Sequence, residues 1–187
     1  MVQKSKPIRR VVTGNDPDGN SCVVYDSAAP DVHQRPNSPG TYFNELWTFH
    51  SVPVDTSTAI DGGASGRPLS HSPPVGGGHL RIVQSTQQSS KALASDSAAT
   101  SLQAMNATGQ TERRDDGPHW NMHRTPTVDY GICLGSNRYL VLDNSEIEIR
   151  SGDAIIQLGT WHSWDNRTKE NGKMMYVMMD GEFPDEG

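Results

Sequence analysis

Two histidines and one aspartate carry the chemistry that this sequence indicates most clearly. His162 follows an apolar segment and a glycine turn at Gly159, and tryptophans stand at positions 161 and 164. His123 and Asp129 are six residues apart on a second predicted strand, so strand alternation places both side chains on one face. Imidazole and carboxylate groups that converge inside a protein are typical ligands of a divalent metal ion. We therefore predict a metal site formed by His123, Asp129 and His162.

The segment before and around His123 is polar at every second residue. If 117–133 is one extended strand, a single face carries His119, Asn121, His123, Thr125, Thr127, Asp129, Gly131 and Cys133. This face is a poor hydrophobic core and a good lining for a polar cavity. A buried aspartate without a partner is costly, and a cation would explain its presence. The alternative is a hydrogen-bonded polar patch that holds no metal.

His162 must reach this face from another strand. The apolar strand predicted over 154–158 leads to it through the turn at Gly159. Trp164 and Asn166 share the face of His162 by alternation, so we expect Trp164 to wall the cavity and Asn166 to hold a ligand or a backbone group.

Short strands separated by turn residues dominate the elements around these side chains. The second half predicts strands over 128–134, 138–142, 146–150, 154–158 and 173–179. Strict alternation over 146–150 predicts that Ile147 and Ile149 face inward. The first half predicts a hairpin from 9–13 and 21–25, and further strands over 45–52 and 79–84. This pattern favours an all-β fold, a barrel or a sandwich, over a βα architecture.

The 187 residues are expected to form one domain with distinct stretches. Residues 1–84 supply N-terminal strands and loops that pack on the barrel and extend its sheets. Residues 85–117 form an irregular or partly helical connection, with a short helix within 91–105. Residues 118–182 contain the chemical motifs, and 183–187 form an acidic tail.

Composition narrows the classes of partner. A formal net charge of −6 argues against nucleic acid, and no apolar run is long enough to span a membrane. Two cysteines are too few for a disulfide framework, so we expect a cytoplasmic protein that binds a small molecule. His33, His50, His71 and His79 are scattered and are expected to be solvated or locally bonded, with His50 and His79 as possible cavity residues because they lie on predicted strands.

The stretch from His123 to Asn166 resembles the two motifs of the cupin superfamily, small single β-barrels that usually hold a divalent metal. In the second motif Gly152, Asp153, Gly159, His162 and Asn166 match, while Gln157 stands where proline is usual. In the first motif His123 matches the leading histidine and Asp129 takes the usual glutamate position. Thr125 replaces the second histidine, in a run that resembles small cupins with His-Arg-Thr followed by Asp-Tyr-Gly.

This resemblance implies one divalent ion on His123, Asp129 and His162, with positions left for water or substrate. Iron(II), manganese(II) and zinc(II) all suit two nitrogens and one oxygen. His119 is a further candidate ligand. The resemblance also implies a homodimer, formed in some cupins by exchange of N-terminal strands.

Three functions compete at this point. The first is a metal-dependent lyase or isomerase acting on a small oxygen-rich organic acid or carbonyl compound, with Lewis-acid stabilisation of an enolate-like intermediate. His119 and Tyr130 are then the candidate proton-transfer residues, although alternation turns Tyr130 outward. The candidate substrate-binding residues are Asn121, Thr125, Trp164 and Asn166. The second function is an iron(II) dioxygenase, and the third is a non-catalytic ligand-binding module.

Overall fold

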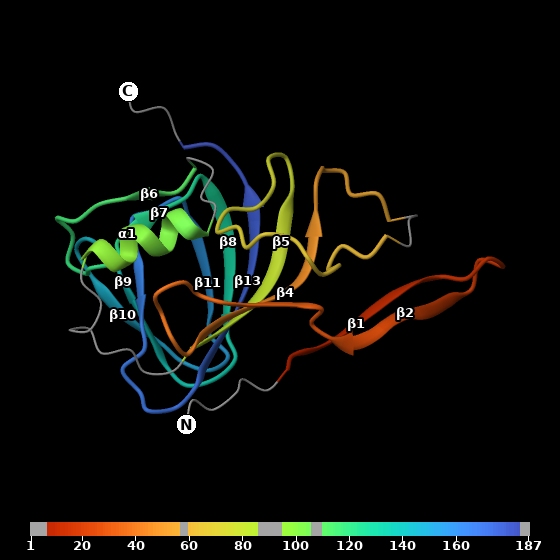
Figure 1. Cartoon of the computed structure of the whole chain (residues 1–187), viewed down its shortest axis with the longest axis horizontal. Coiled ribbons are helices and arrows are strands. Elements are labelled where there is room, and N and C mark those ends of the chain that lie inside the picture. Colours follow the sequence, from red (N-terminus) through yellow and green to blue (C-terminus); the bar gives the residue numbers. More distant parts are fainter. Residues whose placement is uncertain (1–6, 57–59, 86–94, 106–109, 184–187) are drawn as a thin grey trace.

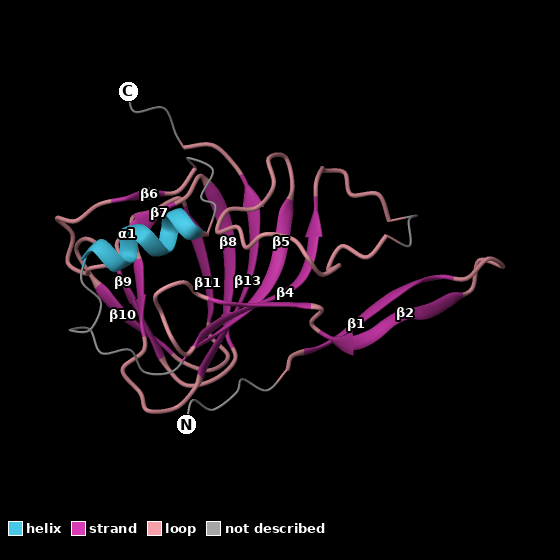
Figure 2. Ribbon diagram, viewed as in Figure 1, coloured by secondary structure: helices cyan, strands magenta, loops and turns pink. Residues whose placement is uncertain are grey.

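The protein is an antiparallel β structure with one short helix among the residues described here. This computed structural model describes residues 7–56, 60–85, 95–105 and 110–183. The strands are β1 (Arg9–Asn15), β2 (Ser21–Ala28), β3 (Asp31–Gln34), β4 (Thr41–Phe49), β5 (Gly78–Ser85), β6 (Glu112–Arg113), β7 (His123–Arg124), β8 (Thr127–Cys133), β9 (Arg138–Val141), β10 (Glu146–Ile149), β11 (Ala154–Leu158), β12 (Ser163–Asp165) and β13 (Gly172–Asp180). The helix α1 spans Ser95–Ala104. Figure 2 shows strands running through the body of the protein, with loops and turns between them.

A six-stranded antiparallel sheet forms the larger layer, in the order β11-β8-β13-β5-β4-β3. Side chains along β8 alternate between the interior and the outer face, which puts Thr127, Asp129, Gly131 and Cys133 inside. The predicted alternation of this segment is therefore confirmed from Thr127 onward.

The smaller layer contains β10, β9 and β12, in that order. A single β-bridge joins His123 of β7 to His162, the residue before β12, and β7 also pairs with β6. This bridge connects the short β6–β7 ribbon to the smaller layer. Cys133, Leu140, Ile149 and Met174 form a buried cluster between the two layers.

The helix α1 lies beside the sheets at the end where β6 and β7 run (Figure 1). Leu102 and Met105 pack with Phe43 of β4 in a second apolar cluster. No helix in the described part of the chain has the length and apolarity needed to cross a membrane.

The β1–β2 hairpin projects away from the body (Figure 1). Its strands pair with each other, whereas β3 and β4 extend the larger sheet. Arg10 ties the hairpin to the body, because its guanidinium donates to both carboxylate oxygens of Asp61 at 2.6 Å and to the carbonyl of Leu46 at 3.1 Å.

Several sequence predictions need correction. Residues 117–122 do not continue the strand, because Pro118 and Pro126 interrupt backbone pairing and the extended segments are limited to 123–124 and 127–133. Ile149 is buried as predicted, but Ile147, on the edge strand β10, is 46% exposed. The predicted helix within 91–105 begins at Ser95, and 91–94 lie outside the described residues, as do 184–187 of the acidic tail.

Asp61→Asn is expected to reduce the free energy of unfolding by about 2 kcal/mol, because it leaves the buried Arg10 guanidinium without its counter-charge. Asp26→Asn is the matched control. Asp26 pairs with the neighbouring Arg9 on the exposed part of the hairpin, so the urea midpoint should hardly change. Equal urea midpoints for the two variants would contradict the anchoring role of Arg10.

Candidate functional site

A cavity of about 130 Å³ opens between the layers and contains most of the side chains that the sequence singles out. Its lining includes His119, Asn121, His123, Asp129, His162, Trp164 and Asn166. Strands from both layers supply these residues, although many positions separate them along the chain.

His123 and His162 are direct cross-strand partners. Each donates its backbone N–H to the carbonyl of the other at 3.0 Å, and their ring centroids are 4.4 Å apart. Gly159 makes the preceding turn with a left-handed φ of 61°, a conformation that glycine adopts without strain. The backbone pairing therefore holds the two imidazoles side by side.

Both histidines are anchored in the same way. The Nδ1 of His123 lies 2.8 Å from the carbonyl of Asn121, and the Nδ1 of His162 lies 2.9 Å from the carbonyl of Thr160. A carbonyl only accepts, so each Nδ1 carries the proton and each Nε2 keeps a lone pair. Burial lowers the pKa of both side chains, to about 4 for His162. Neutral imidazoles with a free Nε2 are the form that binds metal.

Asp129 supplies a buried carboxylate beside this pair. Its side chain belongs to β8, and its Oδ1 has no hydrogen-bond partner in the described structure. Burial raises the pKa of Asp129 to about 6, while Thr127 and Arg81 oppose that rise. An unpartnered carboxylate oxygen is a position where a cation would lower the free energy.

Gln157 stands between Asp129 and His162. Its register partner on β8 is Asp129, and its amide nitrogen is 3.4 Å from Oδ2 of Asp129 and 3.0 Å from each ring nitrogen of His162. No three His, Cys, Asp or Glu side chains in the described ranges form a group that could hold a metal ion. The donors fit a divalent ion in their chemistry, but Gln157 must turn aside before they can share one.

His119 presents the opposite tautomer. Its Nδ1 accepts from the backbone N–H of Asn121 at 3.2 Å and lies 2.7 Å from the hydroxyl of Ser163. The proton of the neutral ring is therefore on Nε2, which is buried and has no partner within the described chain. His119 reaches the cavity from a turn and not from the strand that the sequence predicts.

The predicted substrate-binding and catalytic residues do not all face the cavity. Tyr130 is 47% exposed on the outer face of β8, as alternation requires. The Thr125 hydroxyl is 2.7 Å from that of Thr127, and neither Thr125 nor Tyr130 belongs to the cavity lining. Asn166 lines the cavity, but its amide donates to the carbonyls of Ser85 and Glu170. These bonds hold the loop between β12 and β13.

Sequence reasoning missed His71. Instead of being solvated, its ring stands edge-on to His123 with centroids 5.1 Å apart, and burial lowers its pKa to about 3. Arg81 holds the segment that carries it, by donating to the carbonyls of Ser70 and His71. No motif marks His71, because it lies in a loop whose path depends on Arg81.

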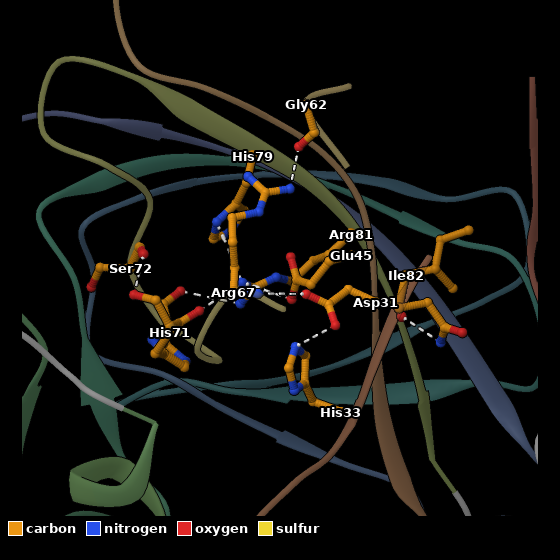
Figure 3. A network of polar contacts seen from close by, with 12 residues as sticks. Asp31, His33, Glu45, Gly62, Arg67, His71, Ser72, His79, Arg81 and Ile82 are labelled. Atoms are coloured by element: carbon orange, nitrogen blue, oxygen red, sulfur yellow. Dashed lines mark hydrogen bonds and ion pairs between the residues drawn. The ribbon is translucent and has the colours of Figure 1, made fainter. Parts of the chain in front are cut away.

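The remaining histidines are dispersed around a second pocket. His79 is buried next to Arg81, and His33 is 3.4 Å from a carboxylate oxygen of Asp31 (Figure 3). His50 is exposed and lines that second pocket together with His79. Neither His50 nor His79 lines the main cavity.

Comparison with known proteins gives partial matches. No protein-family model matches the chain. It is 43% identical over 61 residues to phomopsin biosynthesis cluster protein C′ of Diaporthe leptostromiformis, and 40% identical over 63 residues to the cupin-domain-containing oxidoreductase virC of Hypocrea virens. Each match covers 32% of this chain and 32% of the relative, so the match spans about a third of either protein. These matches support the cupin resemblance.

Solved structures superpose loosely on the whole chain. The cupin domain of Cnp3 from Schizosaccharomyces pombe is 10% identical, with a TM-score of 0.43, and the match covers 92% of this chain and 87% of that one. The ethanolamine utilization protein EutQ of Salmonella typhimurium is 7% identical, with a TM-score of 0.43 and coverage of 95% and 100%.

Asp129→Asn is expected to stabilise the metal-free protein at pH 8 and not at pH 4. Because the folded pKa of Asp129 is about 6 and the ordinary value is 3.8, the wild-type protein loses stability as the pH rises between these values and does not regain it above them. The difference approaches about 3 kcal/mol. Urea unfolding in EDTA measures it, and Asp18→Asn in the exposed hairpin turn controls for the lost charge. A gain that is equal at both pH values would contradict this account.

Proposed function

We propose that this chain is a metal-dependent enzyme of the cupin type that acts on a small oxygen-rich organic acid or carbonyl compound. His123, Asp129 and His162 would hold one divalent ion: iron, manganese or zinc. The observation that supports this most strongly is the shared anchoring of the two histidines, whose Nδ1 protons go to backbone carbonyls and whose Nε2 atoms keep their lone pairs. The ion would have to displace the Gln157 amide from Nε2 of His162. Oδ1 of Asp129, which has no hydrogen-bond partner in the described structure, would supply the third donor atom.

The reaction class that best suits the cavity is a lyase or isomerase reaction, such as decarboxylation, dehydration or tautomerisation. When bound, the ion would supply Lewis-acid polarisation of a substrate carbonyl or carboxylate. The protein's own contribution is a proton donor, since His119 lines the same cavity with its proton on Nε2. Ser163 fixes that ring through Nδ1 and so keeps the proton available to the substrate.

An iron(II) dioxygenase is the second candidate. Two histidines and one carboxylate form the ligand set that non-haem iron oxygenases use. Several partly matching relatives carry the name cupin-domain-containing oxidoreductase, which favours redox chemistry more than the residues alone do. The identity of the bound metal separates the candidates, because zinc would argue against oxygen activation and iron would favour it.

Metal analysis of the purified, untagged protein is expected to find roughly one ion per chain. His162→Ala should lose most of it, because the pair of imidazoles is then broken. His50→Ala is the matched control and should keep the full content, since His50 lies outside the cavity. Gln157→Ala should bind the ion at least as tightly as the wild-type protein, because it removes a competing hydrogen-bond donor and no ligand. Full metal content in His162→Ala would overturn the proposal.

We also propose that the protein pairs as a homodimer through its N-terminal hairpin. Val11 and Val23 are 50% and 58% exposed on a hairpin that projects from the body. Exposed apolar side chains of this kind are typical of a protein–protein contact surface. Sedimentation at micromolar concentration should give a dimer, and Val11→Asp combined with Val23→Asp should give a monomer. A wild-type protein that sediments as a monomer would contradict the proposed dimer.

A further inference from the structure

Arg35 brings a guanidinium into the cavity without a carboxylate to balance it. The residue follows β3, and its backbone N–H donates to the carbonyl of Thr41 at 2.8 Å. Its Nε donates to the hydroxyl of Ser101 at 3.1 Å and its Nη2 to Oδ1 of Asn121 at 3.0 Å. These neutral oxygens use two of the five donors, and no carboxylate in the described ranges lies within ion-pair distance.

Three other buried or half-buried arginines of this protein have a charged partner. Arg10 pairs with Asp61, Arg81 with Glu45 and Arg124 with Glu112. Burial without such a partner lowers the pKa of Arg35 to about 10. Burying an uncompensated cation costs free energy, and an anionic ligand would recover it.

Arg35 is also linked to the proposed metal ligands. Its Nη2 holds the side chain of Asn121, and the backbone carbonyl of Asn121 in turn accepts from Nδ1 of His123. An anion on Arg35 would therefore lie in the same cavity as the two imidazoles. The rest of the lining includes large apolar and aromatic groups, among them Phe43, Val83 and Trp120.

Arg138 is the other cavity arginine without a carboxylate at ion-pair distance in the described structure. Its guanidinium packs on the backbone of Gly172 and donates to the hydroxyl of Ser85. With its guanidinium already covered in this way, Arg138 is less suited to receive a ligand than Arg35.

We propose that Arg35 binds the carboxylate of an aromatic or similarly apolar carboxylic acid, whose body packs against the apolar wall of the cavity. This inference rests on the proposed function, since both use one cavity, and it narrows the substrate class. The three remaining donors of this guanidinium match a single carboxylate, which they can hold with two parallel hydrogen bonds.

The test compares phenylacetate with phenylacetamide, its uncharged counterpart, by quenching of tryptophan fluorescence, because Trp120 and Trp164 line the cavity. The wild-type protein should bind the acid more tightly than the amide. Arg35→Gln should weaken binding of the acid by about tenfold or more and leave the amide unchanged. Arg150→Gln, which removes the same charge from the outer surface, should behave like the wild type.

A purely structural role for Arg35 predicts something different, namely that Arg35→Gln weakens acid and amide equally. That result overturns the inference, and so does a wild-type protein with no preference for the acid, or a preference lost in Arg138→Gln instead. If Arg35→Gln does not fold, Arg35→Lys serves in its place. It should keep part of the preference for the acid, because it keeps the charge but not the paired donors.

Repeating the titrations in EDTA separates this inference from the proposed metal site. A preference that persists without metal and needs Arg35 supports the carboxylate site even if no ion binds. A preference that vanishes with the metal and survives in Arg35→Gln places the carboxylate on the ion, which overturns the inference and leaves the proposed function standing.

Discussion

The backbone pairing of His123 with His162 is the interaction on which the rest of this site depends. Two N–H to carbonyl bonds connect the β6–β7 ribbon to the smaller layer and, in the same step, place two imidazoles 4.4 Å apart at their centroids. Opposed residues of an antiparallel pair have their side chains on one face. The same backbone pairing thus joins the two parts of the fold and places the two candidate ligands side by side, and a variant that loosens the bridge would disturb both.

The cavity beside that pair is built from groups whose charges are unbalanced or suppressed. Burial keeps His71, His123 and His162 neutral, raises the pKa of Asp129 and lowers that of Arg35, which has no carboxylate at ion-pair distance among the described residues. Such an arrangement is costly by itself and becomes favourable when a cation meets the carboxylate and an anion meets the guanidinium. Gln157 offsets part of this cost, because its amide donates to Asp129 and His162 together.

Alternation and turn residues were sufficient to predict an all-β fold, the strands of the second half and the inward face of β8. They also predicted that His123, Asp129 and His162 face one cavity, because each belongs to a strand or to a turn that ends one, and all three line the main cavity. They failed where tertiary contacts decide the path of the chain. His119 lies in a turn, and His71 reaches the cavity on a loop that Arg81 holds. Arg35 belongs to no sequence motif, and what sets it apart is that no carboxylate of the described ranges lies at ion-pair distance. Ile147 lies on an edge strand, where alternation alone does not ensure burial.

The tautomers of the cavity histidines test the central claim most directly. Long-range nitrogen–proton correlation spectra of the metal-free protein, labelled with ¹⁵N and assigned with single His→Gln variants, report which ring nitrogen carries the proton. The account predicts protonated Nδ1 for His123 and His162 and protonated Nε2 for His119. A proton on Nε2 of either His123 or His162 would contradict it, because the lone pair required for a shared ion would then be turned into the backbone.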